Sequence, residues 1–176
     1  MNTLGEAAPG TTPFRVCFVC AGNICRSPMA ASVFTDLVAG AGLEQFVDVS
    51  SAGTGDWHVG EHADQRTITA LHQQGHDASA HRAKQFDPDR FRSYDLVVAL
   101  DRSHDRILRA WADNDADHSK VHLLLSFDNS QTGTLDVPDP YYSDAQMFDT
   151  VLGMIDHACR ALFHQLEPAL TQGATP

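Results

Sequence analysis

The sequence predicts an α/β protein with three layers (α/β/α), in which helices cover both faces of a central sheet of four parallel strands. Two observations lead to this prediction. Short runs rich in β-branched and aromatic residues alternate along the chain with segments whose apolar residues recur at helical spacing. Strands that alternate with helices form right-handed crossovers, and the resulting parallel sheet is covered on both faces.

The first half of the chain is expected to contain two strands that alternate with two helices, at residues 14–20, 27–40, 46–51 and 63–74. The first strand, FRVCFVC, suits a buried position because only Arg15 is polar. Ser27 and Pro28 are typical of a helix N-cap and the first helical residue. This helix is expected to end near Gly40, and the second helix at Gly75.

The second half is expected to repeat the alternation, at residues 94–100, 102–111, 121–125 and 144–166. The third strand, YDLVVAL, is a nearly continuous apolar run, as in fully buried parallel strands. A long loop with Pro138 and Pro140 spans residues 128–143. The last helix is the clearest, because eight apolar residues recur at helical spacing: Met147, Phe148, Val151, Leu152, Ile155, Cys159, Leu162 and Phe163.

Length and composition indicate one domain. The chain has 176 residues, of which 43% are apolar, enough to bury a sizeable core. We expect this domain to span residues 14–168. Residues 1–13 are rich in Gly, Ala, Thr and Pro and are expected to form a disordered leader, because they lack the basic start and apolar segment of a signal peptide. Residues 169–176 are expected to be a flexible tail.

The charge and the cysteines argue against several classes of protein: nucleic-acid-binding, membrane-binding and disulfide-stapled secreted proteins. With 23 acidic and 12 basic residues, the net charge of −11 argues against binding to nucleic acid or to anionic membranes. No apolar run approaches the ~20 residues of a membrane span. The four cysteines are not spread as in a disulfide-stapled secreted domain. Free thiols and a cytoplasmic location are therefore expected.

The segment CAGNICRS, residues 20–27, has the form C-x5-R-S and lies between the first strand and the first helix. Ligands of such sheets bind at the carboxyl ends of the strands, where this loop is expected. Five residues between Cys20 and Arg26 allow the backbone to curl around a tetrahedral anion, and Gly22 and Asn23 tolerate left-handed conformations. The helix N-terminus adds positive potential, and the guanidinium can grip two phosphate oxygens.

The same electrostatic field is expected to activate Cys20. A free thiol is only a few per cent ionised at neutral pH, but a helix N-terminus and a nearby cation can lower a thiol pKa by several units. We therefore expect Cys20 to be a thiolate at pH 7 and to act as a nucleophile. Ser27 can donate a hydrogen bond to the sulfur when it departs, and Asn23 is expected to hold the loop in shape.

A general acid for this chemistry is expected in DVPDPYY, residues 136–142. Pro140 restricts Asp139 to extended geometry and so fixes the direction of its carboxylate. An isolated Asp-Pro is by default a solvated turn. Here Tyr141 and Tyr142 follow it, and aromatic walls suit an aryl phosphate.

CAGNICRSP and the late DPYY, together with SSAGT, DWHVG, HRAKQ and VALDRSH, resemble the low-molecular-weight protein tyrosine phosphatase family, particularly its actinobacterial branch. The likeness runs from about Val16 to the last helix. It implies that Cys20 is the nucleophile, Arg26 the phosphate clamp and Asp139 the general acid and then base. It also implies a supporting network of Asn23, Ser27, Ser51, His81 and Asp101. The residues expected to line the substrate site are Ala21, Gly22, Ile24, Cys25, Trp57, Tyr141 and Tyr142.

The resemblance further implies hydrolysis of phosphotyrosine in proteins through a cysteinyl-phosphate, with no metal and no organic cofactor. Phosphotyrosine-containing proteins are the expected partners, and the chain is expected to be a monomer. Tyr141 and Tyr142 are candidate sites for a tyrosine kinase, and Cys25 is a candidate for a reversible disulfide with Cys20. Some actinobacterial relatives are exported without a signal peptide, and the sequence does not decide this.

The sequence leaves three alternatives to consider. Arsenate reductase of the same fold needs two further cysteines downstream, and none lies between Cys25 and Cys159. A non-catalytic phosphotyrosine-binding module would be expected to lack the nucleophile or the acid, and this chain has both. Cys17 and Cys20 have the spacing of zinc ligands, but no second pair follows. Cys17 is therefore interpreted as a small buried apolar residue.

Overall fold

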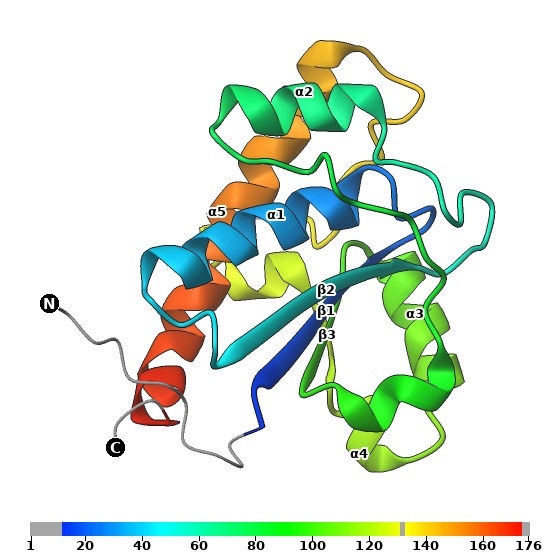
Figure 1. Ribbon diagram of the computed structural model, residues 1–176. Coiled ribbons are helices and arrows are strands. Elements are labelled where there is room, and N and C mark those ends of the chain that lie inside the picture. The colour runs from blue at the N-terminus through cyan, green and yellow to red at the C-terminus, as the bar shows by residue number, and fades with distance from the viewer. Residues whose placement is uncertain (1–11, 131–132, 174–176) are drawn as a thin grey trace, which may run out of the picture.

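The structure, a computed structural model, describes residues 12–130 and 133–173 and has the expected three-layer α/β/α architecture (Figure 1). Four parallel strands form the sheet in the order β2-β1-β3-β4. They are β1 (Phe14–Cys20), β2 (Val47–Gly53), β3 (Leu96–Ala99) and β4 (Val121–Leu123). The predicted fold class is thus confirmed.

Strand order determines where the functional site can form. From β1 the chain turns to one side to form β2, then crosses to the other side to form β3. The loops that leave the carboxyl ends of β1 and β3 therefore diverge and leave a crevice between them, where open α/β sheets bind ligands. The loop after β1 begins at Cys20, and the residues after β3 include Asp101.

The helices form one layer on each face of the sheet (Figure 1). One layer contains α1 (Arg26–Gly40), α2 (Gln65–Gln73) and α5 (Ala145–Gly173). The other contains α3 (Arg102–Trp111) and α4 (Asp115–His118). Side chains alternate along β1, so that Phe18 packs in the core under α1 and α5 while Cys17 and Val19 pack in the core on the opposite face.

Several predicted boundaries were wrong, each for a local reason. The fourth strand stops at Leu123, because Leu124 and Leu125 turn into the short helix η2 (Leu124–Phe127) and are buried in the core. Helix α1 begins at Arg26 instead of at Pro28. Ser27 is therefore not an N-cap; it lies in the first turn and its hydroxyl faces the loop. The sequence also gave no signal for α4 or for η1 (Pro88–Ser93).

The carboxyl-terminal helix is longer than predicted. It continues through Pro168 to Gly173, so residues 169–173 are helical and do not form part of a loose tail. Leu170 is buried against the core, which stabilises the last turns although proline removes one backbone donor. Residues 1–11 of the predicted leader and residues 174–176 of the predicted tail lie outside the described residues. Within residues 12–130 and 133–173, no helix has the length and apolarity needed to cross a membrane.

Candidate active site

The loop between β1 and α1 is held by Asn23, which is fully buried and has left-handed backbone geometry, with φ of 58°. Its side-chain Nδ2 donates to the hydroxyl oxygens of Ser27 at 2.8 Å and Ser51 at 3.0 Å. Its Oδ1 accepts from the backbone N–H of Lys84 at 3.0 Å. One side chain thus connects the loop to α1, to β2 and to the segment after α2.

His81 supports the same loop from outside. Its Nε2 lies 2.7 Å from the carbonyl oxygen of Asn23, so Nε2 must carry the proton and donate it. Burial lowers the pKa of His81, outweighing its hydrogen bond to Asn23, and this favours the neutral imidazole. The structure therefore places Asn23, Ser27, Ser51 and His81 together behind the loop, as expected for a support network.

The carbonyl groups of the loop are hydrogen-bonded to neighbouring segments, whereas its backbone N–H groups have no acceptor among the described residues. The carbonyl of Cys20 accepts from Thr54 at 2.8 Å, that of Ala21 from Gly55 at 3.0 Å and that of Ile24 from Asp64 at 2.9 Å. Among the described residues, the backbone N–H groups of residues 21–25 have no hydrogen-bond acceptor. A curled run of unpaired N–H groups ahead of a helix N-terminus is an anion-binding arrangement.

Gly22 is needed for a different reason than expected. Its backbone is not in the left-handed region, which Asn23 alone of the pair adopts. A Cβ at Gly22 would instead lie 2.9 Å from Cδ2 of His58, so glycine allows that ring to approach the loop. Gly53 has a similar function beneath the loop, where a Cβ would lie 2.5 Å from the carbonyl oxygen of Ala21.

Cys20 lies at the base of this arrangement and is 3% exposed. Its Sγ is 2.9 Å from Oγ of Ser27. Asn23 donates to the same oxygen, so the Ser27 hydroxyl can donate its own proton either to the sulfur or to the carbonyl oxygen of Ala52, which lies farther away at 3.4 Å. The hydrogen bond of Ser27 therefore stabilises the sulfur most when the sulfur is an anion.

The other three cysteines are in apolar surroundings. Burial raises the pKa of the Cys17 thiol to about 11 and that of Cys25 to about 12, and it also raises the pKa of Cys159. These thiols are therefore protonated at neutral pH. Cys17 packs on the opposite sheet face from Cys20, so the two cannot share a zinc ion, and no group of three metal-ligating side chains occurs within the described ranges.

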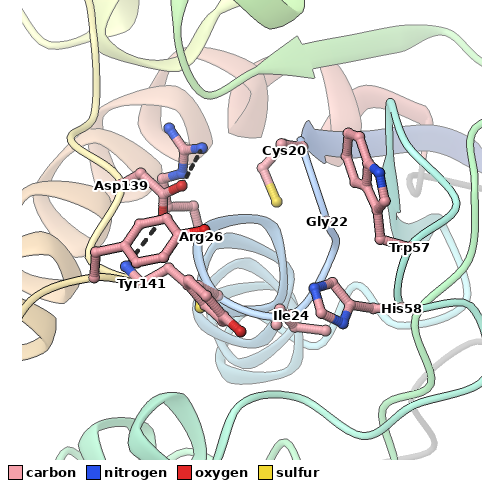
Figure 2. A pocket seen from close by; sticks show the side chains of 11 residues that line it. Cys20, Gly22, Ile24, Arg26, Trp57, His58, Asp139 and Tyr141 are labelled. Carbon is pink, nitrogen blue, oxygen red and sulfur yellow. Dashed lines mark hydrogen bonds and ion pairs between the residues drawn. The ribbon is translucent and has the colours of Figure 1, made fainter.

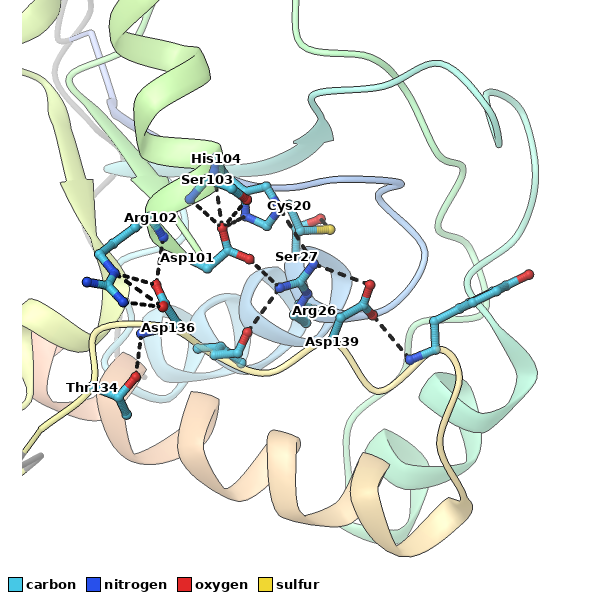
Figure 3. Close-up of polar contacts among 12 residues, drawn as sticks. Cys20, Arg26, Ser27, Asp101, Arg102, Ser103, His104, Thr134, Asp136 and Asp139 are labelled. Atoms are coloured by element: carbon cyan, nitrogen blue, oxygen red, sulfur yellow. Dashed lines mark hydrogen bonds and ion pairs between the residues drawn. The ribbon is translucent and has the colours of Figure 1, made fainter.

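Arg26 reaches the crevice from the first turn of α1 and is held along one edge (Figure 3). Its Nη1 donates to Oδ2 of Asp101 at 2.8 Å and to the carbonyl oxygen of Val137 at 3.0 Å. Asp101 in turn accepts from the backbone N–H groups of Ser103 and His104 at the start of α3. Burial opposes ionisation of Asp101, but its hydrogen bonds from Ser103, from the backbone N–H of His104 and from Arg26 lower its pKa.

With Nη1 occupied, the guanidinium edge formed by Nε and Nη2 is left for a ligand. Among the described residues, no hydrogen bond involves Nε of Arg26. Nη2 lies 3.6 Å from Oδ2 of Asp139. A planar edge with two parallel donors matches two oxygens of a phosphate.

Asp139 faces the crevice from the loop before α5, and Figure 2 shows its carboxylate across the hollow from Cys20. Its Oδ1 accepts from the N–H of Tyr141 at 3.1 Å. Arg66, which the sequence did not indicate, holds this loop by donating to the carbonyl oxygens of Tyr141 at 3.0 Å and Ser143 at 3.1 Å. Asp64 fixes Arg66 through hydrogen bonds of 2.9 and 3.0 Å.

The crevice is a hollow of about 350 Å³ with a polar floor and aromatic walls (Figure 2). Trp57 and Tyr142 are 69% and 93% exposed, unusually high values for large aromatic side chains. His58, which was not predicted, lines the wall between the loop and Tyr141, with Nδ1 bound to Glu61 at 2.9 Å. The hollow is lined by all the residues predicted to line the substrate site, namely Ala21, Gly22, Ile24, Cys25, Trp57, Tyr141 and Tyr142. The predicted catalytic residues Cys20, Arg26 and Asp139 line it too.

The chain is similar to known phosphatases over nearly its whole length. Residues 15–172 match the family described as low molecular weight phosphotyrosine protein phosphatase. A low molecular weight protein-tyrosine-phosphatase of Streptomyces coelicolor is 50% identical over 150 residues, 85% of this chain and 91% of the relative. Low molecular weight protein-tyrosine phosphatase A of Mycobacterium tuberculosis is 43% identical over 161 residues, 91% of this chain and 96% of the relative. The crystal structure of YfkJ from Bacillus subtilis has a TM-score of 0.84 at 33% identity, covering 92% and 99% of the two chains.

Proposed function

Because the chain belongs to the low molecular weight phosphotyrosine protein phosphatase family, we propose that it hydrolyses phosphotyrosine in proteins with Cys20 as the nucleophile. The family predicted from the sequence is confirmed, including its similarity to relatives from actinobacteria. The chain is therefore a protein-tyrosine-phosphatase, a hydrolase of phosphoric monoesters. The roles of individual residues are inferred from the geometry of the site, and the observation that supports them most is that Cys20 lies beside the unpaired N–H groups of residues 21–25.

Binding of the phosphate uses the two groups of donors on the floor. The N–H groups of residues 21–25 point at the equatorial oxygens, and the Nε–Nη2 edge of Arg26 grips two of them. Nη2 of Arg26 lies 3.6 Å from Oδ2 of Asp139, so an incoming phosphate takes over this guanidinium contact. This exchange costs little, because the floor is already held by Asn23, Asp101 and the carbonyl of Val137.

Cys20 and Asp139 lie on opposite sides of the hollow, which suits attack by one and protonation of the leaving group by the other. The sulfur attacks phosphorus, so an S–P bond forms while the bond from phosphorus to the phenol oxygen breaks. Asp139 gives its proton to the departing phenol oxygen. Asp139 then takes a proton from water, which attacks the cysteinyl-phosphate and releases inorganic phosphate. Ser27 donates a hydrogen bond to the sulfur as it leaves as a thiolate.

Depth and wall chemistry favour an aromatic substrate. Cys20 is 3% exposed and lies in a hollow whose walls include Trp57 and Tyr142, so a long side chain must carry the phosphate to the sulfur. A phosphotyrosine ring stacks between these exposed aromatic rings and buries apolar surface on both sides. Phosphoserine is too short to reach the sulfur. Proteins that contain phosphotyrosine are the proposed partners, and a cytoplasmic location fits four free cysteines.

The rival reaction, reduction of arsenate through a cysteine relay, is not favoured. Cys159 is buried in the core against the carbonyl of Ala30, and Cys17 lies on the other sheet face. Cys25 lines the same hollow as Cys20, but a relay needs a second partner.

The experiment compares Cys20→Ser with Cys17→Ala, a control at a buried cysteine on the opposite face of the sheet. Turnover of p-nitrophenyl phosphate and of a phosphotyrosine peptide is expected to vanish in Cys20→Ser and to persist in the control. A phosphoserine peptide of the same sequence is expected to be a poor substrate for the wild-type enzyme. Wild-type turnover by a folded Cys20→Ser protein would defeat the assignment.

A further inference from the structure

His104 lies behind Arg26, in the first turn of α3, and is 2% exposed (Figure 3). Its Nε2 is 3.5 Å from Nη2 of Arg26. Its Nδ1 is 3.3 Å from Oδ1 of Asp101, without the alignment of a hydrogen bond, and is one of the few buried side-chain nitrogens without such a partner within the described residues. Buried polar groups are normally paired, so an unpaired ring nitrogen at this position calls for an explanation.

The two neighbours of His104 determine which ring nitrogen carries the proton. A guanidinium only donates, so Nε2 can face Nη2 favourably only through its lone pair. The proton of a neutral ring is therefore on Nδ1, where the Asp101 carboxylate lies. The opposite tautomer would bring an N–H against the guanidinium and a lone pair against a carboxylate.

The charges around the ring agree with a neutral imidazole. Burial and the positive charge of Arg26 lower the pKa of His104 to about 4, although Asp101, Asp139 and Asp136 all act in the opposite direction. His104 is therefore uncharged at physiological pH. A neutral acceptor fixes the direction of Nη2 without cancelling the charge of Arg26, which a second carboxylate would do.

We propose that His104 is a positioning residue that holds Nη2 of Arg26 so that the Nε–Nη2 edge of the guanidinium faces the phosphate. The proposal rests on the proposed function, in which Arg26 binds the phosphate. Asp101 and the carbonyl of Val137 hold only Nη1, and a guanidinium held at one nitrogen can still tilt. Asp139 lies 3.6 Å from Nη2 and would draw it into an ion pair that competes with phosphate. His104 opposes this tilt from the other side of Nη2.

Two substitutions of similar size separate positioning from packing. His104→Leu fills the space without any polar atom, whereas His104→Gln places an amide oxygen where it can accept from Nη2. We expect His104→Leu to weaken competitive inhibition by inorganic phosphate and to lower kcat/KM for p-nitrophenyl phosphate, each by about tenfold or more, because hydrogen bonds to charged groups are the strong ones. We expect His104→Gln to recover both to within about threefold of wild type.

Thermal unfolding supplies the control, because a purely structural role predicts the reverse order. Leucine suits a buried site better than glutamine does, so packing alone would make His104→Gln the more damaged protein. Phosphate inhibition that follows thermal stability would overturn the proposal. Inhibition of His104→Leu by phosphate as strong as that of the wild type would also overturn the proposal. The proposed function would still stand if Cys20→Ser is inactive in the same experiments.

The tautomer can be measured on the wild-type protein, so the proposal is testable even if both variants unfold. Nitrogen-15 NMR of the imidazole is expected to show a protonated Nδ1 and an unprotonated Nε2 from pH 5 to pH 8. A proton on Nε2, or titration of the ring near pH 6.5, would overturn the proposal.

Discussion

Asn23, Arg26 and Ser27 on the floor of the site are nearly fully buried, and each makes at least two hydrogen bonds. At the rim, Trp57 and Tyr142 are mostly exposed and offer apolar rings to solvent. Buried polar groups must be satisfied in the folded protein, so the floor has its geometry before a substrate arrives. Covering an exposed apolar ring is favourable, so the rim contributes binding free energy only when a substrate is bound. We therefore expect the floor to determine the rate of the chemistry and the rim to determine which phosphate ester is accepted.

Arg26→Lys tests the floor most severely. Lysine keeps the charge but cannot contact Asp101, the carbonyl of Val137 and two phosphate oxygens together. We expect kcat/KM for p-nitrophenyl phosphate to fall by about 10³-fold, because a bidentate contact to the transferring phosphoryl group is lost. Steady-state kinetics at saturating and limiting substrate give both constants. Lys84→Arg is a control at a basic residue behind the loop. Activity near that of the wild type in Arg26→Lys would refute the proposed bidentate contact between Arg26 and the phosphate.

Asp139→Asn separates bond breaking from binding. It removes the proton donor but keeps the size of the side chain, so the loss should depend on the leaving group. We expect about a 10²- to 10³-fold lower kcat for phenyl phosphate and a much smaller loss for an ester whose phenol is strongly acidic. A series of substituted phenyl phosphates measures this dependence. Equal losses across the series would show that Asp139 is not the acid; Asp136→Asn, which removes a carboxylate three residues earlier, provides the control.

Lowering the pH should decrease the free energy of unfolding, because protonation of His104 is unfavourable in the folded protein. Its pKa in the folded protein, about 4, lies below the unfolded value of 6.5, so the unfolded chain binds the proton more readily. The resulting contribution to stability is complete above pH 6.5 and is lost as the pH falls toward 4. It amounts to up to about 3 kcal/mol. Urea unfolding of wild type and His104→Gln at several pH values between 7 and 4 isolates it. The wild-type free energy of unfolding should fall more steeply, and parallel curves would count against a buried neutral imidazole.

The predictions from the sequence worked best where the signal was local. The segment CAGNICRS contains the predicted nucleophile, loop and clamp in eight consecutive residues, and the structure places Cys20 and Arg26 at one crevice. Arg66, His58 and His104 were missed because their partners are distant in sequence or are not indicated by any spacing. Arg66, for example, holds Tyr141, which lies 75 residues later.

Where local rules conflicted with packing, packing prevailed. Ser27 and Pro28 have the pattern of a helix start, yet α1 begins earlier and the Ser27 hydroxyl is used by Cys20 and Asn23. The last helix was predicted to end at Leu166, yet it continues through Pro168, and buried Leu170 stabilises the following turn. No rule based on short segments could predict either outcome.

Trp57→Ala should have the mildest consequence, confined to binding. Loss of the exposed ring removes stacking on the substrate but leaves the floor intact. We expect KM for a phosphotyrosine peptide to rise by about threefold to tenfold, with kcat within about twofold of wild type. A matched change at Leu135, an exposed apolar residue outside the crevice, should alter neither constant. A large fall in kcat for Trp57→Ala would mean that the rim also shapes the floor.

Covalent trapping decides whether the floor does the chemistry. The Asp139→Asn enzyme is mixed with p-nitrophenyl phosphate and quenched in acid within the first turnovers. The quenched protein is digested, and the masses of the peptides are measured by mass spectrometry. Because this ester needs little help from an acid while hydrolysis of the intermediate needs a base, the phosphoenzyme should accumulate, with one phosphoryl group on the peptide that contains Cys20. A burst of p-nitrophenol with no phosphoryl group on that peptide, or with the group on another residue, would rule out Cys20 as the nucleophile.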